Sequence, residues 1–111
     1  MKKIKRKIAV IASEVVPYTQ SGGLGDITNE ISKAFKKLDQ KVIIITPFYK
    51  GAIDIEKYQL KKIKENVTVI LDNNNKEKVN FWRGKHEDGL PVYFIENKKY
   101  ISILIYYFSR K

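Results

Sequence analysis

Three glycines stand directly before an acidic residue in the stretch "TQSGGLGDITNE", and these residues have the clearest means of binding a ligand. Gly22, Gly23 and Gly25 allow the backbone to approach a ligand closely. If a helix begins here, its unpaired N–H groups and its dipole attract an anion such as a phosphate. Asp26 then has two possible roles, as a cap of the helix or as an acceptor of hydrogen bonds from ligand hydroxyl groups. The alternative to ligand contact is a turn that needs small residues only for packing.

The flanking patterns place this stretch between a strand and a helix. Residues 8–13, "IAVIAS", form a continuous apolar run, which is typical of a strand buried on both faces. Between Leu24 and Leu38 apolar residues recur every three or four positions, which predicts a helix of about four turns with one apolar stripe. Residues 41–46, "KVIIIT", predict a second buried strand that stops at Pro47.

Strand, helix and strand in this order predict a βαβ unit with parallel strands and a right-handed crossover, so the fold class is α/β. The glycine stretch then follows the carboxyl end of the first strand. Open α/β sheets bind their ligands at that end.

The second half of the chain has the pattern of β-strands. Residues 58–72, 76–84 and 90–96 read as extended segments, separated by turn-forming residues at 73–75 and 85–89. In residues 76–83 successive side chains lie on opposite sides of the chain, with Asn80 and Trp82 on one side. This pattern predicts a solvent-facing hairpin arm. We expect the apolar third segment to return to the sheet. His86 lies in the turn-like "KHEDG" and is expected to be a solvated loop residue.

Composition disfavours several classes of protein. The net charge of +10 comes almost wholly from lysines spread along the chain, since the arginines are Arg6, Arg83 and Arg110 alone. Arginine forks and aromatic platforms are absent, so we expect no nucleic-acid partner. The absence of cysteine removes disulfides and Cys-ligated zinc. No apolar run reaches the ~20 residues of a spanning helix, and the basic N-terminus lacks a cleavage site, so we expect a cytoplasmic protein without a membrane partner.

Two common nucleotide-binding motifs do not fit the glycine stretch. A dinucleotide fingerprint requires an acidic residue at the end of the second strand, and that strand ends in Thr46 and Pro47. A Walker A motif requires Lys after its last glycine, and here Asp26 follows Gly25. Nicotinamide and flavin sites are therefore disfavoured, and a P-loop is excluded.

The stretch from Lys7 to Tyr49 resembles the N-terminal edge of bacterial glycogen synthases and plant-type starch synthases. Three features carry the resemblance: Ser13-Glu14-Val15 with Pro17, the block from Ser21 to Asp26, and Pro47 with Tyr49. A looser similarity continues through "FWRGKHEDGLPVYFIEN", to about Asn97. The first block is highly specific.

The resemblance implies a GT-B glycosyltransferase, in which two Rossmann-like domains face each other across a cleft. Such enzymes transfer glucose from ADP-glucose to the non-reducing end of an α-1,4-glucan with retention of configuration, and they need no metal or other cofactor. The glycine-rich loop would cradle the diphosphate, Asp26 would lie near the sugars, and Glu14 would lie on the acceptor side. The implied substrate-binding residues are Glu14, Gln20, Ser21, Gly22, Gly23, Gly25 and Asp26.

The chain departs from the family in two respects. The family normally has Lys at the position of Gln20, whose amide can donate a hydrogen bond but has no charge. The later cleft His and the charged residues of the second domain have no counterpart here, and His86 does not match the family's His. The catalytic residues are thus unassigned, and we expect the isolated chain to be inactive.

The sequence therefore predicts a partial N-terminal catalytic domain over residues 1–111. It comprises a βαβ unit at 7–49, a β-rich part at 58–97 and an atypical, aggregation-prone tail at 101–111, which is either altered or divergent. A small stand-alone module that binds a nucleotide or sugar phosphate without catalysis is the alternative. The sequence leaves open whether the glucose donor is ADP-glucose or UDP-glucose, and it leaves the oligomeric state open.

Overall fold

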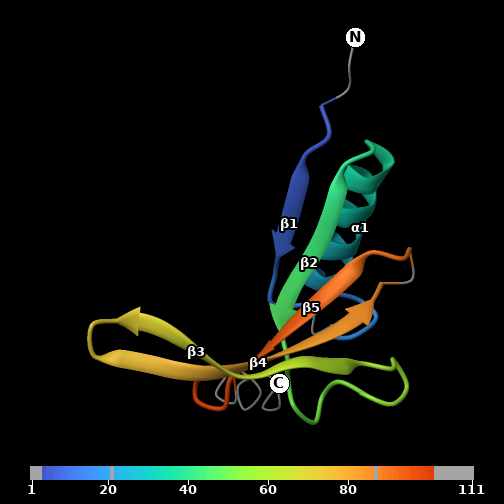
Figure 1. The fold of residues 1–111 in the computed structure, drawn as a ribbon. Coiled ribbons are helices and arrows are strands. Elements are labelled where there is room, and N and C mark those ends of the chain that lie inside the picture. The colour runs from blue at the N-terminus through green and yellow to red at the C-terminus, as the bar shows by residue number, and fades with distance from the viewer. Residues whose placement is uncertain (1–3, 21, 87, 102–111) are drawn as a thin grey trace.

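The computed structural model describes residues 4–20, 22–86 and 88–101 and contains one helix and five strands within them (Figure 1). In chain order the elements are β1 (Lys7–Ile11), α1 (Leu24–Lys37), β2 (Lys41–Pro47), β3 (Lys61–Asp72), β4 (Asn75–Lys85) and β5 (Pro91–Glu96). The predicted order of strand, helix and strand is confirmed. The predicted atypical tail covers residues 101–111, and all of it except Ile101 lies outside the described part of the chain.

The five strands form one mixed sheet in the order β1-β2-β5-β4-β3. β1, β2 and β5 are parallel, with Val10 opposite Ile44 and Ile44 opposite Val92. β4 runs antiparallel to both β5 and β3. The α/β class is confirmed for this part of the chain, and β5 returns to the sheet as predicted.

β3 and β4 form a long hairpin that extends from the rest of the sheet (Figure 1). Its inner end is not solvent-facing, because the Trp82 ring stacks on Phe48 with centroids 4.7 Å apart and planes within 3°. The Trp82 indole N–H also donates to Glu96 Oε1 at 2.9 Å. The prediction of a solvent-facing arm is therefore wrong at Trp82, since alternation along one strand does not reveal which neighbouring loop covers it.

The core lies where β2 and β5 meet the loops that follow β1 and β2. Ile44, Val92 and Phe94 from the strands are fully buried, together with Val15 from the first loop. Phe48 follows β2 and joins the same cluster. The loop that carries the candidate site is thus part of the core and not an appendage to it.

The helix meets the sheet through small residues and Phe35, which is partly buried against the core, while most of its apolar stripe is exposed. The buried positions of α1 are Gly25, Thr28, Asn29 and Ser32, whereas the stripe residues Leu24, Ile27, Ile31 and Leu38 are 42–65% exposed. Small side chains allow close approach of the helix to the strands. Their hydroxyl groups are satisfied within the helix, since Thr28 Oγ1 donates to the Leu24 carbonyl at 2.9 Å and Ser32 Oγ to the Thr28 carbonyl at 2.8 Å.

Candidate functional site

The loop between β1 and α1 lies at the carboxyl ends of the three parallel strands (Figure 1). Ala12 N donates to the Ile45 carbonyl at 3.1 Å and continues the pairing with β2 to the start of the loop. The helix then begins at Leu24, so its N-terminus opens at the same edge of the sheet. This is where α/β folds collect ligands.

The first part of the loop is held rigidly. Thr19 closes it through two hydrogen bonds with Val15, one from the Val15 N–H to Thr19 Oγ1 at 3.0 Å and one from the Thr19 N–H to the Val15 carbonyl at 2.9 Å. Tyr18 is buried, its hydroxyl donates to the Lys85 carbonyl, and its ring contacts Phe94 edge-on at 5.0 Å. The residues before the glycines are therefore tied to the sheet.

The three glycines differ in their surroundings. A Cβ at Gly25 would lie 2.9 Å from the Thr19 carbonyl oxygen and 3.0 Å from Val16 Cγ2, so the packing of the helix against the loop requires glycine there. A Cβ at Gly22 or Gly23 would meet nothing within 4 Å. Packing therefore accounts for one glycine and leaves two open to solvent, where a ligand can approach the backbone.

The helix N-terminus has no side-chain cap. Gly23 is the N-cap residue, and no side-chain hydrogen bond caps the helix there. Asp26 does not cap the helix, because its Oδ2 accepts a hydrogen bond from Gln20 Nε2 at 2.9 Å. Both residues are exposed, and they bracket the glycines from either side. Ser21 lies outside the described residues.

The amides of the first helical turn are the other polar groups of this loop. Among the residues that the structure describes, Leu24 N–H and Gly25 N–H donate to no carbonyl or side chain, while Ile27 N–H bonds to the Gly23 carbonyl at 3.1 Å. Such unpaired N–H groups, aligned with the helix dipole, favour an anion. The start of α1, beside the Gln20–Asp26 pair, is therefore the candidate anion site.

Glu14 is the second acidic residue of this edge, and it is buried, with 5% of its surface exposed. It follows β1 directly and lies close to Tyr49, whose pKa is raised by burial first and then by the negative charge of Glu14. The Tyr49 hydroxyl donates to the Ser13 carbonyl at 2.8 Å. Tyr49 thus joins the two loops that follow neighbouring parallel strands, and it does so next to Glu14.

Sequence reasoning noted Tyr49 but did not place it against Glu14. Their proximity could have been predicted from the sequence, because both residues follow the ends of two strands that were expected to be parallel. Asn29 Oδ1 and Thr46 Oγ1 were not anticipated as polar atoms of this end of the sheet. Both are buried, and neither has a hydrogen-bond partner among the described residues. They add two acceptor atoms on α1 and β2.

His86 is buried, with 2% of its surface exposed, so the prediction of a solvated loop residue is wrong. The turn is drawn onto the helix, because Lys36 Nζ donates to the Asp88 carbonyl and Lys33 Nζ lies 3.7 Å from Asp88 Oδ2. The Asp88 N–H donates to His86 Nδ1 at 3.2 Å. His86 is thus buried within this turn.

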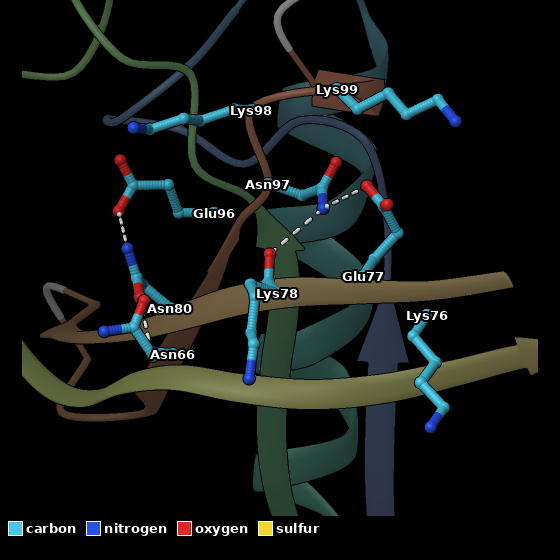
Figure 2. A pocket seen from close by; sticks show the side chains of 9 residues that line it. All are labelled: Asn66, Lys76, Glu77, Lys78, Asn80, Glu96, Asn97, Lys98 and Lys99. Atoms are coloured by element: carbon cyan, nitrogen blue, oxygen red, sulfur yellow. Dashed lines mark hydrogen bonds between the residues drawn. The ribbon is translucent and has the colours of Figure 1, made fainter.

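A hollow of about 410 Å³ lies between the β3–β4 hairpin and the end of β5 (Figure 2). Its polar groups bond to one another: Asn97 Nδ2 donates to Glu77 Oε1 at 3.2 Å, and Asn80 Nδ2 donates to Glu96 Oε1 at 3.0 Å. The lysine side chains around it point in different directions, with Lys98 and Lys99 turned away from each other (Figure 2). No set of groups converges on a ligand here, so the glycine loop is the better candidate site.

The described residues contain neither a cluster of metal ligands nor a membrane-spanning helix. No group of three or more His, Cys, Asp or Glu side chains in residues 4–20, 22–86 and 88–101 is placed to hold a metal ion. In the same ranges, no helix has both the length and the apolar character needed to cross a membrane.

Comparison with known proteins gives a consistent result. The family model described as the starch synthase catalytic domain matches residues 7–110. The glycogen synthase of Geotalea daltonii is 38% identical over 96 residues, which cover 86% of this chain and 19% of that protein. The glycogen synthase of Pseudothermotoga lettingae is 34% identical over 100 residues, 86% of this chain and 20% of that protein.

A solved structure agrees with the sequence relatives. The catalytic domain of Starch Synthase IV from Arabidopsis thaliana, bound to ADP and acarbose, superimposes with a TM-score of 0.66 at 29% identity. The match covers 87% of this chain and 19% of that one. The matched proteins are glycosyltransferases of the GT-B fold, as the sequence predicted. The chain belongs to the starch synthase catalytic-domain family, and it spans about a fifth of the length of the relatives it matches.

Proposed function

We propose that the protein acts in the transfer of glucose from ADP-glucose to the non-reducing end of an α-1,4-glucan, with retention of the anomeric configuration. The observation that carries the proposal is the uncapped start of α1 beside the open glycines Gly22 and Gly23, at the carboxyl ends of parallel strands. The matched Arabidopsis domain, which is bound to ADP and acarbose, supports a nucleotide and a glucan-like sugar as ligands.

The chain's own groups have distinct roles in this proposal. The amides of Leu24 and Gly25 hold the diphosphate, and they stabilise the negative charge that grows on it as the bond to the anomeric carbon breaks. Asp26 accepts hydrogen bonds from sugar hydroxyls, and Gln20 holds its carboxylate in place. Glu14, positioned beside Tyr49, faces the acceptor glucan.

Transfer also needs groups that this chain does not contain. No residue is assigned as the acid or base that moves the proton of the acceptor hydroxyl, because the matched segment is about a fifth of each relative. We therefore expect the 111-residue chain alone to show no turnover.

A chimera tests the proposal. This chain replaces the matching segment of the Geotalea daltonii glycogen synthase, and transfer of radiolabelled glucose to glycogen is measured with ADP-glucose and with UDP-glucose. We expect turnover with ADP-glucose in the chimera and none in the isolated chain. A folded chimera that binds ADP but never transfers glucose would contradict the proposal and would favour a binding module without catalysis.

Variants within the chimera locate the site. Gly23→Val places a branched side chain over the helix terminus without an internal clash, so it should raise KM for ADP-glucose on the order of 100-fold while stability is preserved. Gly23→Ala is the matched control and should have a smaller effect. Gln20→Lys adds a charge beside Asp26 and should lower the KM about fivefold. Equal KM values for all three variants would contradict the assigned site.

A further inference from the structure

The loop between β1 and α1 is held by two tyrosine hydroxyl groups that lie outside it. Tyr49 Oη donates to the Ser13 carbonyl at 2.8 Å, and Tyr58 Oη donates to the Pro17 carbonyl at 3.3 Å. Both tyrosines belong to the clamp segment, residues 48–60, which joins β2 to β3. The two hydrogen bonds therefore fix the loop backbone at two points between the end of β1 and the glycines.

The clamp segment is itself anchored in the core. The Phe48 N–H donates to the Ile95 carbonyl at 2.8 Å, and the Phe48 ring stacks on Trp82. Further along the segment, the side chains of Ile53 and Leu60 are buried in the same apolar cluster as Phe48. The two tyrosine hydroxyls thus come from a rigid support, which is what a precisely shaped binding loop needs.

The loop in turn contacts the start of α1. The Val16 N–H donates to the Gly25 carbonyl at 3.4 Å, and a Cβ at Gly25 would lie 2.9 Å from the Thr19 carbonyl oxygen. Pro17, which accepts the hydrogen bond from Tyr58, follows Val16 directly. A shift of the loop backbone at Pro17 would therefore change the packing of the first helical turn, whose amides are the candidate anion site.

Burial alone does not account for both hydrogen bonds. Tyr49 is 3% exposed, so its hydroxyl needs a partner inside the protein. Tyr58 is only partly buried, so water is an alternative partner for its hydroxyl. The two tyrosines nevertheless donate to the same loop, at carbonyls four residues apart. This convergence favours a role in shaping the loop over a role in stability alone.

We propose that Tyr49 and Tyr58 are positioning residues of the glycine-loop site. Their hydroxyl groups hold the loop in the path that places the first amides of α1 for a diphosphate, and neither tyrosine touches the ligand. A loop that is already ordered loses less conformational freedom when the ligand binds, so the two bonds strengthen binding. The inference rests on the proposed function, because the diphosphate is the ligand proposed there for this loop.

Replacing each tyrosine by phenylalanine removes the hydroxyl group and keeps the ring. ADP is titrated into the 111-residue chain, and heteronuclear NMR follows the backbone amides of Gly23 and Leu24, which report on the loop and give Kd. Tyr49→Phe and Tyr58→Phe should each raise the Kd for ADP about three- to tenfold, because the loop loses about one net hydrogen bond. The double variant should raise Kd further.

Tyr93→Phe is the matched control. Tyr93 lies on β5, where its ring contacts the Arg83 guanidinium at 5.6 Å, so the same chemical change is made away from the loop and should leave Kd unchanged. Circular dichroism confirms that each variant is at least about 95% folded under the binding conditions, and loss of stability alone then changes Kd by less than about a tenth. A purely structural role of the tyrosines therefore predicts no change in Kd.

Three results would overturn the inference: unchanged Kd in the folded Tyr49→Phe and Tyr58→Phe variants, an equal rise in Tyr93→Phe, or a wild-type chain whose Gly23 and Leu24 amides do not shift with ADP. Glucose transfer is measured separately, in the chimera. A chimera that transfers no glucose, while the two tyrosine variants still weaken ADP binding, would contradict the proposed function and leave the positioning role in place. Transfer in the chimera with unchanged Kd in these variants would contradict the positioning role alone.

Discussion

At the scale of single residues, the glycines of one short loop serve two different purposes. Gly25 lies where the first turn of α1 meets the loop at Val16 and Thr19, and the fold leaves no room for a Cβ there. Gly22 and Gly23 face open space, so their lack of side chains serves access and not packing. A substitution series can therefore separate stability from ligand binding within four residues.

Gly25→Ala should lower the free energy of unfolding by about 1–3 kcal/mol, because the Thr19 carbonyl that the new Cβ meets is backbone and cannot move aside cheaply. Gly23→Ala is the matched control and should change stability by less than about 0.5 kcal/mol. Urea unfolding followed by circular dichroism measures both. Equal midpoints for the two variants would show that the close approach at Gly25 does not exist.

Glu96 gives a pH-dependent prediction. Burial raises the pKa of its carboxyl, but hydrogen bonds from Trp82 and Asn80 and the charges of Lys62 and Lys50 outweigh burial, so the pKa lies below its ordinary value of 4.5. A carboxyl with a depressed folded-state pKa stabilises the fold above its unfolded pKa, and this stability is lost as pH falls through the folded pKa.

The free energy of unfolding should therefore fall as the pH decreases from about 5 toward about 3, and it should fall less steeply in Glu96→Gln. Urea titrations at several pH values measure both slopes. Glu56→Gln, at an exposed turn position, controls for the loss of one negative charge from the chain. Parallel slopes for the wild type and Glu96→Gln would contradict a stabilising role of the ionised Glu96.

At the scale of elements, the helix packs its small residues and Phe35 on the sheet and has its aliphatic residues on an exposed flank. Ile31→Glu should change stability by less than about 0.5 kcal/mol, since Ile31 is 43% exposed. Ser32→Val should cost about 1–3 kcal/mol, because Ser32 is fully buried against the sheet. Thermal unfolding of both variants measures the difference. A larger loss of stability in Ile31→Glu than in Ser32→Val would mean that the apolar stripe packs against the sheet.

The elements also show what sequence patterns can and cannot predict. Two β-branched runs, one on each side of a segment with helical periodicity, were enough to predict β1, α1 and β2, because each of these patterns is local in the sequence. The orientation of α1 was not predictable, since an apolar stripe indicates an interface but does not say which one. Burial of His86 depends on Lys33 and Lys36, some fifty positions away in the chain, so no local pattern contains it.

The candidate site also has one part that the sequence predicted and one part that it did not. The glycine loop was identified by composition and by its position after a strand, and the structure places it at the predicted edge of the sheet. The proximity of Glu14 and Tyr49 was not predicted, because it arises from two loops that meet only when β1 and β2 pair in parallel.

At the scale of the whole molecule, the chain is more open than a complete domain. Its radius of gyration is 15.2 Å, and a compact domain of this length has about 13 Å. The long hairpin and the single helix over the sheet account for the difference (Figure 1). We therefore expect the isolated chain to be less stable than the ~5–15 kcal/mol of ordinary domains.

Urea unfolding of the isolated chain, followed by circular dichroism, measures this free energy of unfolding. A value within the ordinary range of about 5–15 kcal/mol would contradict the expectation, by showing that the open shape does not cost stability.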